Sequence, residues 1–218
     1  MSRLTQQLYN EVTEVTSQLI DFSLSIDQNF PSIRKNDKFD VIDWGKSDNL
    51  SIVFKNIEYN SIYNELYTDR NFNIKMVDGT LIQLMYMVYN DKLVSHRLAV
   101  FPNPYLEQFQ NEPEIYEKED LYADILAKSI VPIPIRFDYN EDMHDEYHAK
   151  SHASFGQYKN CRIPVHAPIT PTAFVDFILR NFYSNAYRNF NNLRKTEIEL
   201  ERTISIDEEK LIHFNMTL

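Results

Sequence analysis

Three histidines are spaced four residues apart in the C-terminal half of the chain, at His144, His148 and His152. On one helix, His144 and His148 would share a face, as the two zinc ligands of an HExxH motif do. No glutamate follows His144 in that pattern, and His152 falls in a predicted strand. We therefore predict a site without a metal ion or other cofactor, and a zinc site at these histidines is the alternative.

A β-hairpin is predicted around the third of these histidines. Residues 152–155 and 161–166 each alternate polar and apolar side chains, as half-buried strands do. The five residues between them, 156–160, are an accepted length for a hairpin loop.

The register of this hairpin follows from burial. Pairing Ala153 with Ile163 and His152 with Pro164 places the apolar side chains together on one face of the sheet. A register shifted by one residue would mix the two faces, which burial penalises. The favoured register gathers three polar residues on the opposite face: His152, Ser154 and Arg162.

These polar side chains suit the cleavage of RNA without a metal ion. A histidine that titrates near neutrality can transfer protons, and an arginine fork can stabilise a phosphoryl oxyanion. We predict four catalytic residues, the last from the preceding strand: His152, Ser154, Arg162 and Arg136. The alternative is a polar cluster that only positions the loop, with Asp138 and Arg136 forming an ion pair.

Neighbouring residues extend this hypothesis. Tyr139, Tyr147 or Tyr158 could stack on a base of single-stranded RNA. The single cysteine, Cys161, is predicted to face the core, which disfavours a role as nucleophile.

The elements around the hairpin are predicted from the same kind of pattern. Residues 133–138 form a strand, and Pro132 and Pro134 place its start at a sheet edge because proline lacks an N–H donor. Thr170 and Pro171 begin a helix, as N-cap and first helical residue. This helix presents an aromatic and aliphatic stripe that should pack in the core: Phe174, Phe177, Ile178 and Phe182.

The N-terminal half supplies a long helix and most of the sheet. Apolar residues at three- and four-residue spacing predict a helix over residues 3–26, followed by a linker at 31–36. Strands are predicted at 39–44, 50–55, 72–76, 80–89 and 93–101, with turns at Asp78-Gly79 and Asn90-Asp91 and a helix at 59–67.

Further predictions cover the remaining segments. Residues 112–120 form an acidic surface and 121–130 a helix that leads into the strand at 133–138. Residues 185–192 form an exposed loop, and residues 204–214 a helical turn and a last strand. The fold is predicted to be α+β, with one domain over residues 1–218, a mainly antiparallel sheet and a helix packed across it. Residues 1–30 are also a candidate interaction element.

Composition excludes several classes of function. The chain has three glycines and no GxGxxG or GxxxxGK[ST] motif, which argues against dinucleotide and P-loop nucleotide binding. A formal net charge of −10 disfavours non-specific binding of duplex DNA. A single cysteine fits a reducing compartment, and no segment has the length and apolarity of a signal peptide or membrane helix. We therefore expect a cytoplasmic protein with no membrane contact.

Five segments carry a resemblance to a known family: VDGTLIQLMY, HRLAVFPNP, IRFDY, GQYKNCRIPV and ITPTAFVDFILRNFY. Together they resemble an uncharacterised bacterial domain-of-unknown-function family over roughly residues 50 to 185. The resemblance implies an association with mobile elements and defence systems.

Two functions remain open at this point. The first is a toxin-like or anti-phage defence component that cleaves single-stranded RNA at the His152 and Arg162 face. The second is a non-catalytic acidic subunit that docks on a larger ATPase or nuclease complex, its partner being encoded nearby.

Overall fold

The protein is built around one antiparallel sheet, and a computed structural model describes residues 1–45, 57–105, 133–143, 148–158, 160–189 and 197–215. The order of neighbouring strands is β1-β4-β5-β6-β7-β8-β9, and β3 pairs with β5 and with β2. The strands are β1 (Ser25–Gln28), β2 (Ser32–Asn36), β3 (Phe39–Asp43), β4 (Ile74–Met76), β5 (Leu81–Tyr89), β6 (Lys92–Phe101), β7 (Ile135–Asn140), β8 (Ser151–Phe155) and β9 (Ile163–Pro164). The fold is therefore α+β with a mainly antiparallel sheet, as predicted.

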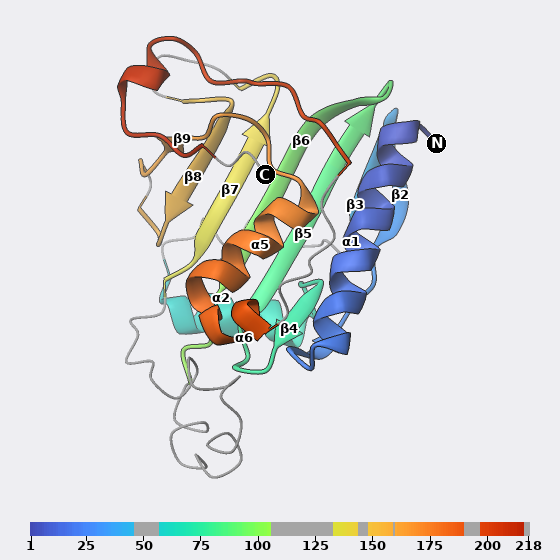
Figure 1. The fold of residues 1–218 in the computed structure, drawn as a ribbon, viewed down its shortest axis with the longest axis vertical. Helices are drawn as coiled ribbons and strands as arrows, with labels where there is room; N and C mark the ends of the chain where they lie inside the picture. Colours follow the sequence, from blue (N-terminus) through green and yellow to red (C-terminus); the bar gives the residue numbers. More distant parts are fainter. Residues whose placement is uncertain (46–56, 106–132, 144–147, 159, 190–196, 216–218) are drawn as a thin grey trace.

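Helices cover the two faces of the sheet unequally. Helices α1 (Arg3–Asp21) and α5 (Pro171–Phe182) lie in front of the sheet in Figure 1, with the short α6 (Ser184–Asn189) after α5. Helix α2 (Tyr59–Thr68) packs on the other face, against Leu81, Ala99 and Phe101. Among the described residues, α2 covers one end of that face, and a pocket lies on another part of it.

Helix α1 belongs to the main core. Leu8, Val12 and Leu19 are completely buried, in a cluster that also contains residues of β5, β6 and α5. The predicted helical boundary at residue 26 is wrong, because the helix ends at Asp21 and Ser23 adopts a left-handed conformation with φ of 57°. The chain then turns back as β1, which pairs with β4.

Helix α5 begins where the sequence predicts. The Thr170 hydroxyl accepts a hydrogen bond from the Ala173 N–H at 3.3 Å, and Pro171 is the first helical residue. Phe174 and Ile178 are completely buried, whereas Phe177 and Phe182 are partly buried at the margin of the core. The predicted stripe thus packs on the sheet along one side.

The β5–β6 hairpin is the centre of the sheet. Asn90 and Asp91, at φ of 48° and 62°, join the two long strands through the predicted two-residue turn. Asparagine and aspartate tolerate these left-handed angles better than most residues, which explains their position here.

Several sequence predictions need correction. Residues 31–36 are not a linker, because β2 pairs along its whole length with β3. Strand β7 lies between β6 and β8 and not at an edge; Pro134 stands just before it, where its carbonyl accepts a hydrogen bond from the Gly156 N–H at 2.7 Å.

The C-terminal third also differs in part. The predicted loop at 185–192 begins as α6, and the predicted last strand is a single parallel bridge between Val165 and Phe214. The predicted helical turn is present at Glu208–Lys210. The predictions for residues 50–55, 112–120 and 121–130 fall outside the described residues. Of the helices that the structure describes, none has the length and apolarity needed to cross a membrane.

Candidate functional site

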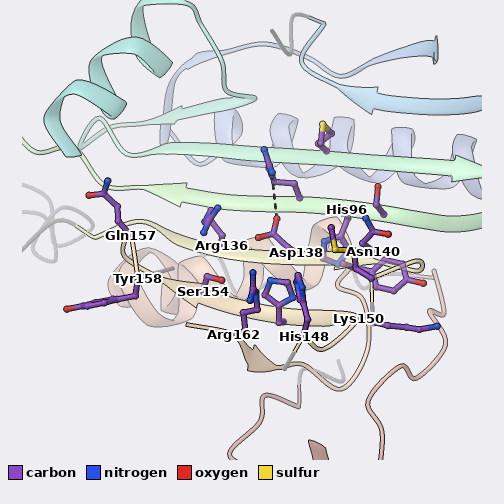
Figure 2. A pocket seen from close by; sticks show the side chains of 16 residues that line it. His96, Arg136, Asp138, Asn140, His148, Lys150, Ser154, Gln157, Tyr158 and Arg162 are labelled. Carbon is purple, nitrogen blue, oxygen red and sulfur yellow. Dashed lines mark ion pairs between the residues drawn. The ribbon is translucent and has the colours of Figure 1, made fainter. Parts of the chain in front are cut away.

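A pocket of about 720 Å³ opens on the face of the sheet opposite α1 and α5. Its floor is made by side chains that alternate with the core residues of β6, β7 and β8. Figure 2 shows Arg136, Asp138, Ser154 and Arg162 lying close together in this pocket. All four residues predicted as catalytic line it: His152, Ser154, Arg162 and Arg136.

The register of the β8–β9 hairpin explains why these residues converge. His152 pairs with Pro164 and Ala153 with Ile163, which confirms the predicted register. Arg162 precedes β9 and is exposed beside the pocket. Cys161 is only partly buried, and its sulfur accepts a hydrogen bond from the Phe155 N–H at 3.4 Å.

Strand pairing arranges the floor in rows across the sheet. Asp138 of β7 lies opposite Arg97 of β6 on one side and opposite His152 of β8 on the other. Arg136 lies opposite Ser154 in the adjacent row. Asp138 forms an ion pair with Arg97, its Oδ1 lying 3.5 Å from the Arg97 Nε. Asp138 also interacts favourably with the Arg136 guanidinium.

Cations predominate in this pocket. Arg97, Arg136, Arg162 and Lys150 line it, and among the described residues that line it Asp138 is the one carboxylate. This contrasts with the formal net charge of −10 for the whole chain. The pocket is therefore a basic site on an acidic protein, which suits an anionic ligand such as a phosphate group.

Arg136 is the most enclosed of these cations, with 8% of its surface exposed. Burial lowers the pKa of its guanidinium, Asp138 opposes that effect, and the positive charges of Arg97 and Arg162 lower the pKa further. An anion bound among the three guanidinium groups would relieve their repulsion.

His152 is held in a defined orientation. Its Nδ1 donates to the Ala149 carbonyl oxygen at 3.1 Å, so the neutral ring carries its lone pair on Nε2. Burial lowers the pKa of His152, Asp138 raises it, and the charges of His148 and Arg162 lower it again. His152 is thus neutral at pH 7 and able to accept a proton.

His148 is a second titratable ring in the site. The centroids of the His148 and His152 rings are 4.9 Å apart, and His148 lines the pocket. Two adjacent imidazoles can perform the two proton transfers that phosphodiester cleavage requires.

The sequence interpretation missed Arg97, His148 and Lys150 as members of the site. Arg97 lies in β6, and no local pattern reveals that β6 pairs with β7 across a long intervening segment. Asp138 carried a usable signal, because it alternates with Arg136 on the same strand and therefore shares its face.

The tyrosines predicted to stack on bases differ in how exposed their rings are. Tyr158 is 76% exposed at the rim of the pocket and is free to meet a base. Tyr139 is buried, and its hydroxyl donates to the Glu141 carboxylate, so it is wrong as a stacking platform. Tyr147 lies outside the described residues.

The zinc alternative depends on His144, which also lies outside the described residues. Within the part of the chain that the structure describes, no group of three or more histidine, cysteine, aspartate or glutamate side chains is arranged to hold a metal ion.

Comparison with known proteins identifies a family. The model of DUF2290, described as an uncharacterized conserved protein family, matches residues 24–216. This match extends beyond the segments 50 to 185 that carry the resemblance in sequence. No curated protein and no solved structure matches the chain.

Proposed function

The chain belongs to DUF2290, a family of uncharacterized conserved proteins, and from the chemistry of its pocket we propose that it cleaves single-stranded RNA without a metal ion. The observation that carries this proposal is the convergence of three arginines and a lysine around two adjacent histidines. Arginine clusters bind phosphate through charge-assisted hydrogen bonds, and histidine pairs transfer protons at neutral pH.

The reaction is a transesterification. The Nε2 of His152 removes the proton from a ribose 2′-hydroxyl, and the 2′-oxygen attacks the adjacent phosphorus. The bond from phosphorus to the 5′-oxygen breaks, and the imidazolium form of His148 donates a proton to that oxygen. The products are a 2′,3′-cyclic phosphate and a free 5′-hydroxyl, so protons and electrons balance.

Two arginines stabilise the charge that develops during this step. Arg136 and Arg162 approach from opposite sides of Ser154 and can bind the non-bridging phosphoryl oxygens. The Ser154 hydroxyl can donate a further hydrogen bond to the same oxygens.

In the cell, this activity makes the protein a toxin-like component of a mobile-element or anti-phage defence system. A protein encoded nearby would then restrain it, as expected for an RNA-cleaving enzyme whose free activity slows growth. An adjacent small antitoxin-like gene would support this role.

The decisive experiment measures cleavage of labelled single-stranded RNA in the presence of EDTA by the wild type and by His152→Asn. His152 is 8% exposed, so alanine would leave a void and an unpaired Ala149 carbonyl, whereas the asparagine amide can still donate to that carbonyl. We expect a loss of about 10²–10⁴-fold in rate, the usual contribution of a general base.

His213→Asn is the matched control. His213 also donates through Nδ1 to a backbone carbonyl, that of Leu211 at 3.0 Å, but it does not line the pocket. It should retain full activity. An inert wild type, or equal activity of the wild type and His152→Asn at equal melting temperature, would contradict the proposal.

A second function is favoured by the net charge of −10. A non-catalytic subunit could use this acidic surface to dock on a basic face of an ATPase or nuclease. This second function would be supported if the wild type is inert on RNA, is harmless in a bacterial host and binds a partner encoded nearby, such as a large ATPase.

A further inference from the structure

The basic pocket extends along β7 and β8, which bears on the length of RNA that it binds. We infer that it holds two successive phosphates of one RNA strand, with the scissile phosphate at Arg136 and Arg162 and the next phosphate at Lys150. This inference rests on the proposed function and adds the substrate class: RNA with at least two consecutive phosphodiesters.

Three rows of side chains define this groove. The first row is Arg136 with Ser154, the second is Asp138 with His152, and the third is Asn140, whose N–H donates to the Lys150 carbonyl at 2.9 Å. Residues of successive rows are two positions apart in sequence, which corresponds to about 7 Å along a strand. Figure 2 shows the same order, with Arg136 and Ser154 toward one end and Asn140 and Lys150 toward the other.

The positive charge along the groove is concentrated at its two ends. The first row carries Arg136 near Arg162 and the third carries Lys150, whereas the middle row holds Asp138 paired with Arg97. Asp138 offsets the charge of Arg97 in the middle row, so the two ends of the groove hold phosphates best. The first and third rows are about 13 Å apart along the strands, and flexible arginine and lysine side chains can lean inward across this interval. Successive phosphates of one strand are closer together than this, so the exposed Arg162 and the partly exposed Lys150 must lean inward to hold them.

Lys150 is available for the second phosphate. Its Nζ pairs with Glu141 Oε1 at 2.8 Å, but the side chains are 29% and 51% exposed. An ion pair at the surface contributes little to stability, so a phosphate can compete with Glu141 for the ammonium group. Asn140 lines the same end of the pocket and adds an amide that can hydrogen-bond a phosphate oxygen.

The test compares substrates that differ by one phosphate. One is a dinucleotide with a single phosphodiester; the other two are trinucleotides in which a 2′-O-methyl group leaves one cleavable bond, on the 5′ or the 3′ side. The ratio of kcat/KM for the better trinucleotide to that for the dinucleotide isolates the second phosphate. We expect a ratio of about ten or more for the wild type, since a hydrogen bond to a charged group is worth about 1.5–3 kcal/mol.

Two variants should move this ratio in opposite directions. Lys150→Ala should bring it close to one, and Glu141→Gln should raise it because the competing carboxylate is removed while an amide can still accept from Tyr139. Lys210→Ala is the control. Lys210 forms an ion pair with Asp207, with 2.7 Å between Nζ and Oδ1, and it does not line the pocket, so its loss should leave the ratio unchanged.

The outcomes separate this inference from the proposed function. Efficient cleavage of the dinucleotide with a wild-type ratio near one, or a ratio that Lys150→Ala does not alter, would overturn the second phosphate subsite and leave RNA cleavage standing. If no RNA is cleaved, binding of fully 2′-O-methylated di- and trinucleotides still decides: tighter trinucleotide binding that Lys150→Ala abolishes supports the subsite, and equal binding refutes it.

Discussion

At the scale of single residues, Arg162 is exposed and lines the pocket. Replacing it with lysine keeps the positive charge but removes the planar pair of donors that binds two phosphoryl oxygens. We predict that Arg162→Lys lowers kcat/KM for RNA about tenfold, because one charge-assisted hydrogen bond is lost or misplaced. Its melting temperature should equal that of the wild type.

Arg202→Lys serves as the control for that substitution. Arg202 is also exposed and pairs with Glu209 at 2.7 Å, remote from the pocket lining. Cleavage by Arg202→Lys should match the wild type. Full activity of Arg162→Lys would remove Arg162 from the proposed mechanism.

His96 gives a prediction about pH and stability. Its Nε2 accepts a hydrogen bond from the Ile169 N–H at 3.0 Å, and its ring lies between Tyr86 and Tyr139. Burial lowers the pKa of His96 to about 4, from an ordinary value of 6.5. Between these two values the unfolded chain binds a proton that the folded protein does not, so stability falls as the pH drops below 6.5.

This effect can be isolated by chemical unfolding at pH 7 and pH 5. One pKa unit corresponds to 1.36 kcal/mol, so His96 should reduce the free energy of unfolding by about 2 kcal/mol between these pH values. His152 acts in the same direction. The fall in His96→Gln should therefore be smaller than that of the wild type by about 2 kcal/mol, and identical falls would contradict the buried, neutral state of His96.

At the scale of elements, α5 offers two phenylalanines in different environments. Phe174 is completely buried and packs edge-to-face on Phe137, whereas Phe177 is only partly buried. The sequence alone placed both rings in one stripe that should pack in the core. The structure favours Phe174→Ala, which should cost about 3–5 kcal/mol, against a total stability of about 5–15 kcal/mol for typical domains.

Phe177→Ala is the matched comparison on the same helix. It should cost less than Phe174→Ala, because solvent can reach part of the site and no closed cavity forms. Urea unfolding monitored by circular dichroism measures both values. Equal costs would show that the depth of the two rings in the core is the same.

At the scale of the whole molecule, α1 lies outside the family match but inside the core of the protein. The family match begins at residue 24, after α1 has ended. Yet Leu8, Val12 and Leu19 are completely buried against the sheet and α5. Each such side chain contributes about 1.5–3 kcal/mol through burial, so the three together are comparable with the total stability of a typical domain, about 5–15 kcal/mol.

We therefore predict that a chain lacking residues 1–23 fails to fold cooperatively. Far-ultraviolet circular dichroism with thermal scanning would show a broad or absent transition. The control is Arg3→Ala, a substitution in the first turn of the same helix that leaves the buried residues in place. A truncated chain that melts at the wild-type temperature would make α1 an accessory element after all.

The distribution of charge is also a property of the whole molecule. A net charge of −10 argues against nucleic-acid binding if it is taken as an average. Four cations gathered on one patch reverse that sign locally, and a nearby phosphate experiences mainly the local field because solvent ions screen charges beyond about 8–10 Å. Composition alone therefore misrepresents the pocket.

The sequence by itself determined the local structure and much of the polar face of the sheet that lines the pocket. Alternation over β7 and β8, burial on one side of the β8–β9 hairpin, and the Thr170-Pro171 start of α5 are short-range patterns. Each depends on neighbours within a few residues, where side-chain period and backbone preferences leave little choice. For that reason His152, Ser154, Arg136 and Arg162 could be grouped before the structure was known.

Only the tertiary structure decided what surrounds that face. Arg97 reaches Asp138 because β6 lies beside β7, and His148 and Lys150 enter the pocket because of the path the chain takes before β8. Likewise, Pro134 stands before a central strand and not at an edge, and burial makes His152 a tightly held side chain. Long-range strand pairing and depth of burial depend on the sum of many contacts far apart in sequence, which no local pattern contains.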